Sequence, residues 1–404
     1  MDHHNPSPEL SILIELLKSD VPIGSTSIIQ NHGPKDIDWD RLAVLADRHG
    51  LYLQLSRAIL NGVDCPDSVD CPESIVCPDS VVEKFRDGQR QRTLLNQILE
   101  VTLADICRAM DHADLPVIAF KGPVLDQLLF GTKRLRQYAD LDIFLPPARI
   151  AEAAVLLKSM GYTTAVDTAD PVRHPVLRFG GEMSFERTQG VSTSLDLHWG
   201  LFNKIFPACL TLAGFEQRLQ TVSIGGHPIR TLSDTDLLVY ACHHVSKHSC
   251  DELAAIKEIA LLILRIPEAS LLRLLNEAHR DGLDRSLLLG PYIAATVFGM
   301  KIPDALLASA SQIPKINSIR DRIVSDMEHL DTRKSTERII QQFIRPRVLD
   351  KIRYSAAKIF IPSPVDWYTL RLHSRWSFLY YGYRPCRLFW RQMVRLKFRR
   401  PTRS

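Results

Sequence analysis

The sequence predicts an α+β fold in which a small α/β unit lies between helical units. Two observations support this prediction. Apolar residues recur at helical spacing before residue 115 and after residue 233, and short apolar runs separated by turn residues occupy the segment between them. The length of 404 residues allows two or three structural units. We expect an N-terminal helical unit over 1–114, an α/β core over 115–232, a C-terminal helical unit over 233–345 and a basic, aromatic tail over 346–404.

The N-terminal segment carries helical patterns over 8–18, 38–60 and about 81–113. A repeated Cys-Pro phrase over 64–80 separates the last two, and it places Cys65, Cys71 and Cys77 six residues apart. Structural zinc sites usually pair their cysteines more closely, and no histidine lies near these three. We interpret the repeat as a short duplicated loop, and its role stays open.

The central segment alternates strand and helix signals. Lys121-Gly122 ends the first apolar run, and Pro123 suits the first turn of a helix, where its missing amide donor is not needed. Gly131 and Gly161 suit helix ends, because glycine adopts positive φ without strain. We expect strands over 115–120, 141–145 and 194–199, and helices over 123–131 and 148–160. Ser233 then marks the start of the next helix, with acids in its first turn.

Three carboxylates have the spacing expected of a metal site. Asp140 and Asp142 lie two residues apart on a predicted strand, so their side chains leave the same face. Neighbouring carboxylates repel each other unless a cation lies between them, and oxygen ligands suit Mg²⁺, or Mn²⁺ in its place. Asp196, on a later strand, offers a third carboxylate. Such a set can serve displacement at phosphorus.

Basic and glycine residues next to these acids suit a phosphate ligand. Gly122, between a strand and a helix, lets a phosphate approach the backbone and the helix amides. Lys121 offers a positive charge at the same turn. Arg134 and Arg136 precede the acidic strand, where a guanidinium can bind triphosphate oxygens in a bidentate manner.

These residues resemble an uncharacterised nucleotidyltransferase family of the DNA-polymerase-β-type superfamily. The resemblance extends over about 35–390 and is most specific over 115–260. It rests on Phe120-Lys121-Gly122, Arg136 to Asp142, Gly161-Tyr162, Leu195 to Trp199, Leu232-Ser233-Asp234 and the helix that carries His244, Lys247 and His248. Two positions depart from the common pattern: Lys-Gly-Pro replaces the superfamily's Gly-Ser turn, and Ala139 stands where a serine is often found.

The resemblance implies a polymerase-β-like core, a small mixed sheet with helices, flanked by helical units. It assigns the triphosphate turn to Lys121 and Gly122, the metal pair to Asp140 and Asp142, and the third acid to Asp196. Arg136 matches the family's arginine. The implied reaction moves a nucleoside monophosphate from an NTP, expected to be ATP, to an unknown hydroxyl- or phosphate-bearing acceptor and releases pyrophosphate. The alternatives are a non-catalytic nucleotide-binding scaffold, a partner protein in a biosynthetic or toxin–antitoxin system, and a phosphohydrolase.

Three histidines are candidates for supporting roles. His198 follows Asp196 by two residues and should share its face, where it can orient an acid, bind phosphate or act as a base. His244 and His248 lie four apart on a helix, a spacing that also occurs in zinc sites, but the sequence shows no third ligand. For this pair we expect a structural or substrate-contact role.

The net charge of +4 conceals an asymmetry. Residues 367–404 hold ten Lys or Arg and no acid, so the rest of the chain carries 4 − 10 = −6. Nucleic-acid contact is therefore confined to the tail and is not favoured. The tail's aromatic residues allow RNA stacking, contact with an anionic membrane surface, or packing on the body. With no apolar run of 18 residues and no secretory signal, we expect a cytoplasmic protein without a transmembrane segment. The sequence does not indicate the oligomeric state.

Overall fold

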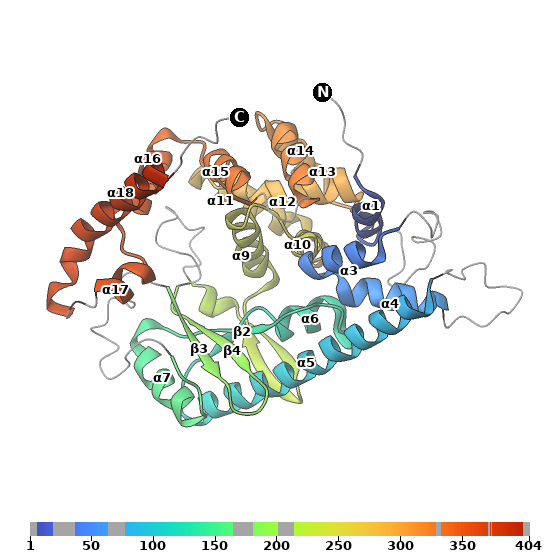
Figure 1. Ribbon diagram of the computed structural model, residues 1–404, viewed down its shortest axis with the longest axis horizontal. Coiled ribbons are helices and arrows are strands. Elements are labelled where there is room, and N and C mark those ends of the chain that lie inside the picture. The colour runs from blue at the N-terminus through green and yellow to red at the C-terminus, as the bar shows by residue number, and fades with distance from the viewer. Residues whose placement is uncertain are drawn as a thin grey trace, which may run out of the picture. The chain divides into compact units, whose positions relative to one another are not determined.

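The computed structural model describes residues 6–18, 37–63, 77–164, 181–200, 214–328, 333–370, 372 and 374–398 (Figure 1). The chain divides into two compact units. The first comprises 1–108, 118–141 and 210–346, and the second comprises 109–117, 142–209 and 347–404. The boundary passes through the strand that carries Asp140 and Asp142. The division into four consecutive segments expected from the sequence stays a prediction.

Helices make up the described part of the chain before residue 115: α1 (Pro8–Glu15), α3 (Trp39–Arg48), α4 (Tyr52–Val63) and α5 (Asp79–His112). The helical pattern expected over 38–60 is two helices rather than one. Gly50, with φ at +68°, lies between them, and a helix cannot continue through this backbone conformation. Most of the Cys-Pro repeat, including Cys65 and Cys71, lies outside the described residues, and Cys77 is a free thiol.

A four-stranded sheet has the order β1-β2-β4-β3. Its strands are β1 (Ile118–Ala119), β2 (Asp140–Phe144), β3 (Glu182–Arg187) and β4 (Thr193–His198). β3 and β4 are antiparallel, and Phe185 faces Leu195. The first strand is shorter than the range 115–120 expected, because the Val117 amide donates to the Leu115 carbonyl in a local turn. A separate hairpin joins β5 (Gln220–Ile224) to β6 (His227–Thr231).

Alternation along the strands separates the core from the polar face. Leu141 and Ile143 of β2 are fully buried, as are Leu195 and Leu197 of β4. The intervening positions therefore present their side chains to the opposite face of the sheet. Glycines with positive φ follow both helices expected in this segment, α6 (Pro123–Phe130) and α7 (Ile150–Ser159). Short 3-10 turns are η1 (Gly131–Lys133), η2 (Pro147–Arg149) and η3 (Phe215–Arg218).

Helices resume at α9 (Asp234–Lys247), whose N-cap Ser233 accepts a hydrogen bond from the Asp236 amide, as expected. In the first unit α9 packs against α10 (Leu253–Arg265) and α12 (Asp284–Phe298), which also contact each other (Figure 1). The remaining helices before residue 345 are α11 (Glu268–Asp281), α13 (Asp304–Ser311), α14 (Ile316–Met327) and α15 (Arg333–Phe343).

The basic tail is largely helical where it is described. Its elements are α16 (Val348–Phe360), α17 (Pro364–Leu370), η4 (Ser374–Leu379) and α18 (Tyr380–Phe398). No helix among the described residues is long and apolar enough to cross a membrane. The expected α+β class, with a small mixed sheet and flanking helices, is confirmed.

Candidate active site

Two carboxylates and one imidazole meet on the part of the sheet that belongs to the second unit. Asp142 on β2 and Asp196 and His198 on β4 each offer one ligand atom, and these atoms lie within 4.8 Å of one another. Asp142 and His198 are only 3% and 4% exposed. Carboxylates this close in a buried setting favour a cation, so the arrangement has the chemistry of a metal site. Among the described residues, this is the group of three or more that could hold one ion.

His198 is held between two carboxylates. Its Nε2 lies 2.8 Å from Asp142 Oδ1, and its Nδ1 lies 3.4 Å from Glu182 Oε2. The β3–β4 register places Glu182 directly opposite His198, which accounts for the second contact. The sequence analysis expected His198 to approach Asp196 and orient an acid. Its observed hydrogen-bond partner is Asp142, and a bond of this kind can fix the direction of a carboxylate, so the orienting role stays a prediction.

Asp140 begins β2 and belongs to the first unit. Its side chain is exposed, whereas that of Asp142 is buried. The close cluster contains Asp142, Asp196 and His198 and does not include Asp140. The three-acid set expected from the sequence therefore keeps two of its members in the cluster, with His198 in place of Asp140.

The Lys121-Gly122 turn lies against the start of β2 within the first unit. Gly122 has φ at +47°, and a Cβ built there would lie 3.2 Å from the Asp140 carbonyl oxygen. A side chain at this position would meet backbone, so glycine allows the close approach. Helix α6 starts immediately after it, with Pro123 at its first position. The Lys121 ammonium lies 5.4 Å from the centroid of the Tyr240 ring.

The two arginines before β2 both pair with carboxylates of the first unit. Arg134 forms an ion pair of 2.7 Å with Glu100, and the Arg136 Nε lies 2.8 Å from Glu258 Oε1. Burial lowers the pKa of Arg136, but the negative charges of Glu258, Glu252 and Asp126 raise it above its ordinary value. These pairs give both arginines a structural role that the sequence did not indicate. The phosphate contact expected of them stays a prediction.

Asp126 is a second feature that the sequence analysis missed. It is 1% exposed on α6, and its Oδ1 accepts a hydrogen bond of 2.9 Å from the Arg136 amide. Burial raises the pKa of this carboxyl to about 6, although the Arg136 amide and charge oppose the rise. Asp126 therefore anchors the loop that leads into β2. An acid among the apolar residues Val124 and Leu125 was the available signal.

His244 and His248 lie on α9 and at its C-cap, with their ring centroids 4.6 Å apart. The Tyr240 ring stacks on His244 at 5.7 Å. Burial lowers the pKa of His248, and the positive charges of Lys247 and Lys121 lower it further, while the carboxylates of Asp251 and Glu337 oppose the shift. Among the described residues no third side chain completes a zinc site with this pair. Both histidines line a cavity of about 280 Å³.

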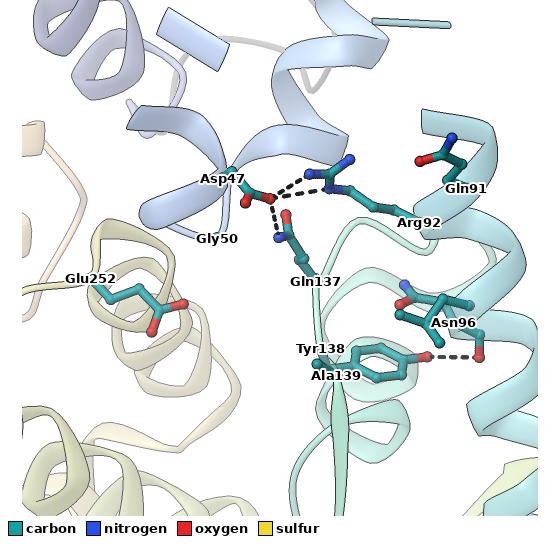
Figure 2. Close-up of a pocket in the computed structure, with 10 residues that line it drawn as sticks. Asp47, Gly50, Gln91, Arg92, Asn96, Gln137, Tyr138, Ala139 and Glu252 are labelled. Atoms are coloured by element: carbon teal, nitrogen blue, oxygen red, sulfur yellow. Dashed lines mark hydrogen bonds and ion pairs between the residues drawn. The ribbon is translucent and has the colours of Figure 1, made fainter. Parts of the chain in front are cut away.

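A larger cavity of about 450 Å³ lies in the first unit, beside the residues that precede Asp140 (Figure 2). Its polar wall centres on Asp47 Oδ1, which accepts hydrogen bonds from Arg92 Nη2 at 2.6 Å and from Gln137 Nε2 at 2.7 Å. Figure 2 shows Glu252 pointing into the cavity from the side opposite Asn96. Sequence reasoning did not find this cavity, because its lining comes from α3, α5, the Gln137–Ala139 loop and Glu252, which are far apart in the chain.

A comparison with protein families relates the part of the chain that holds the cluster to a known family. The profile of a family described as uncharacterised nucleotidyltransferases matches residues 35–299. The match begins where the resemblance was expected to begin and ends well before residue 390, so it includes the sheet, the acidic cluster and α9 but not the tail. No curated protein and no solved structure matches the chain significantly. The match extends over more than half of the sequence, and the chain belongs to this uncharacterised nucleotidyltransferase family.

Proposed function

We propose that the protein is a metal-dependent nucleotidyltransferase. It would transfer a nucleoside monophosphate from an NTP to a hydroxyl group of an acceptor. The acceptor hydroxyl would release its proton to solvent, and its oxygen would form the new bond to the α-phosphorus. The α–β phosphoanhydride bond would break, and pyrophosphate would leave with the electron pair of that bond. The observation that supports this most directly is the buried cluster of Asp142, Asp196 and His198 in a chain of this family.

The donor set suits a divalent cation. Asp142 and Asp196 would supply carboxylate oxygens, which Mg²⁺ and Mn²⁺ prefer. His198 already lies at hydrogen-bond distance from Asp142, so its role would be to fix that carboxylate. When bound, the cation would neutralise charge on the phosphates as the α–β bond breaks. Asp140, exposed at the start of the same strand, would add a further carboxylate.

The residues assigned to the triphosphate lie at the Lys121-Gly122 turn. Lys121 would contribute positive charge, and Gly122 would let the phosphates approach the first amides of α6. Arg136 fits a phosphate contact less well than the sequence indicated, because its Nε is paired with Glu258. Its structural effect would be to hold the loop that ends at Asp140.

For the acceptor we propose the 450 Å³ cavity and an uncharged or cationic molecule rich in hydroxyl groups. A hydroxyl both donates and accepts hydrogen bonds. The wall offers the amide of Gln91 and the carboxylates of Asp47 and Glu252, whereas the amide nitrogens of Asn96 and Gln137 already donate to the Arg136 carbonyl and to Asp47. An anionic acceptor fits poorly. Two carboxylates, Asp47 and Glu252, line the cavity, and the guanidinium of Arg92 is already paired with Asp47.

Pyrophosphate release tests the assignment. Purified protein would be incubated with each NTP, Mg²⁺ and fractions of small molecules from a cell extract. We expect release with wild-type protein and with Glu186→Gln, an exposed acid on β3 used as the matched control. Asp142→Asn and Asp196→Asn should lower the rate by a factor on the order of a hundred or more. Equal rates in all four proteins would refute catalysis at the cluster, and NTP binding without any turnover would favour a scaffold.

A further inference from the structure

The tail of the second unit exposes an unusual amount of apolar surface. On α18 the side chains of Phe389 and Trp390 are 68% and 72% exposed, and Met393 is 42% exposed. α16 contacts α18 (Figure 1). It has no buried residue, and it exposes Val348, Leu349 and Ile352. These six side chains are called the tail surface below. Packing of the tail aromatics on the body was one of three alternatives left open by the sequence, and it stays open; Phe389 and Trp390 are among the most exposed apolar residues of the described tail.

The orientation of α18 is set by a buried carboxylate. Asp366 on α17 is fully buried and pairs with Arg384 Nη1 at 2.7 Å and with Arg387 Nε at 2.6 Å. These two arginines and Arg391 are three and four residues apart, so they share one face of the helix. Phe389 and Met393 are also four apart and lie on another face. The ion pairs hold the face of Arg384 and Arg387 toward α17, so the face of Phe389 and Met393 is turned to solvent. Trp390, three residues after Arg387, is exposed beside that face.

An amphipathic helix of a soluble protein normally packs its apolar face against its neighbours, and α18 does the opposite. Burial of large apolar side chains is the main favourable term in folding, yet here the paired face is polar and the exposed face is apolar. Large exposed apolar patches mark interaction sites. The buried Asp366 pairs therefore maintain a surface whose apolar side chains become buried only when another body covers it.

The positive charge of the tail distinguishes between the partners that could cover the tail surface. Residues 367–404 contain ten cations and no acid. A second copy of the chain would bring two such segments together, and their like charges would repel. RNA would find phosphate contacts and aromatic rings on α18, but the exposed Val348, Leu349 and Ile352 of α16 offer no stacking surface. An anionic lipid surface satisfies all three features: cations meet headgroups, tryptophan and phenylalanine enter the interface, and aliphatic side chains reach the acyl chains.

We propose that α16 and α18 form a peripheral docking surface for membranes that contain anionic lipids. Trp390 and Phe389 would insert at the headgroup boundary, and exposed cations such as Arg391 would contact lipid phosphates. The tail surface lies outside the family match at 35–299, and the proposal for it is independent of nucleotidyl transfer.

Vesicle flotation with the full-length protein tests this proposal. The vesicles would contain phosphatidylcholine alone or mixed with phosphatidylserine. We expect binding only to the phosphatidylserine vesicles, and weaker binding at high salt, because screening reduces the attraction. Phe389→Ser and Trp390→Ser should each weaken binding by about tenfold. Both side chains are exposed, so the variants should fold, and circular dichroism would check this. Val155→Ser, at an exposed apolar position on α7 of the same unit, is the matched control and should bind like wild type.

Three results would overturn the proposal. The first is binding that does not depend on phosphatidylserine, or no binding to either vesicle. The second is unchanged binding of the Phe389→Ser and Trp390→Ser variants. The third is that the protein does not bind the vesicles, but Phe389 and Trp390 are needed for binding to a homopolymeric RNA or for a dimer seen in analytical ultracentrifugation.

Discussion

The buried carboxyl of Asp126 makes the stability of the protein depend on pH in a direction opposite to that of a salt-bridged acid. Asp126 is 1% exposed, and burial raises its pKa from 3.8 to about 6. The folded state therefore holds this proton over a pH range in which the unfolded chain has released it. Stability then falls as pH rises from about 4 to 6, since the folded state binds more protons than the unfolded state.

The size of this effect follows from the two pKa values. Their difference corresponds to about 3 kcal/mol that the ionised Asp126 costs the folded protein above pH 7. Asp126→Asn keeps an oxygen that can accept the Arg136 amide and removes the titration. We therefore expect the variant to be close to wild type in stability at about pH 4 and to be more stable by about 3 kcal/mol at about pH 7.5.

Urea unfolding followed by tryptophan fluorescence, at a series of pH values, measures this difference. Asp105→Asn, an exposed carboxylate on α5, is the matched control. The reasoning would be refuted if Asp126→Asn had the same stability relative to wild type at both pH values, or if wild type gained stability over the variant as the pH rose.

Three further predictions concern the geometry around the site. Gly50→Ala should destabilise the protein by about 1–2 kcal/mol or more, because alanine at φ +68° is strained and its Cβ would lie 2.6 Å from Glu252 Oε1. Thermal unfolding measures this, and an unchanged melting temperature would contradict it. Arg136→Gln should lower the free energy of unfolding by about 3 kcal/mol, since it leaves the largely buried Glu258 carboxylate without its ion-pair partner. Urea titrations without nucleotide measure this. Unchanged stability would contradict a structural role and indicate that Arg136 serves phosphate binding alone. His198→Ala should raise the metal concentration needed for half-maximal pyrophosphate release by about 10–100-fold, because Asp142 loses its orienting partner. Unchanged metal dependence would assign His198 a structural role only.

Local patterns in the sequence predicted the fold well where one element decides the outcome. The alternation around Asp140 and Asp142 gave β2, with Leu141 and Ile143 buried as expected. Positive φ at Gly131 and Gly161 follows both central helices. The family resemblance extended this to the fold class, which the sheet and its flanking helices confirm.

Contacts between distant residues could not be predicted in this way. Arg136 and Glu258 are 122 residues apart, and Gln137 meets Asp47 across 90 residues, so no local pattern relates them. His198 lies near Asp196, as their shared face predicted, but its hydrogen bond goes to Asp142, because β2 is the strand next to β4. Which partner a side chain chooses depends on strand order, which short-range periodicity does not specify.

The exposed face of α18 shows a similar limit. Its pattern indicates an amphipathic helix, but the direction of the apolar face depends on Asp366, which belongs to another helix. The pattern alone favours burial of the aromatic residues. In the structure they are exposed, because the buried Asp366 carboxylate pairs with Arg384 and Arg387 and holds that face of α18 toward α17.

The fate of each phosphate of the NTP tests the central proposal most directly. Parallel reactions would use NTP labelled at the α- or the γ-phosphorus, with wild-type protein and with Asp142→Asn. Nucleotidyl transfer predicts that the α label appears on an acceptor molecule and the γ label in pyrophosphate, and that both products are lost in the variant. Release of the γ label as inorganic phosphate, or transfer that persists in Asp142→Asn, would contradict the assignment of this cluster to nucleotidyl transfer.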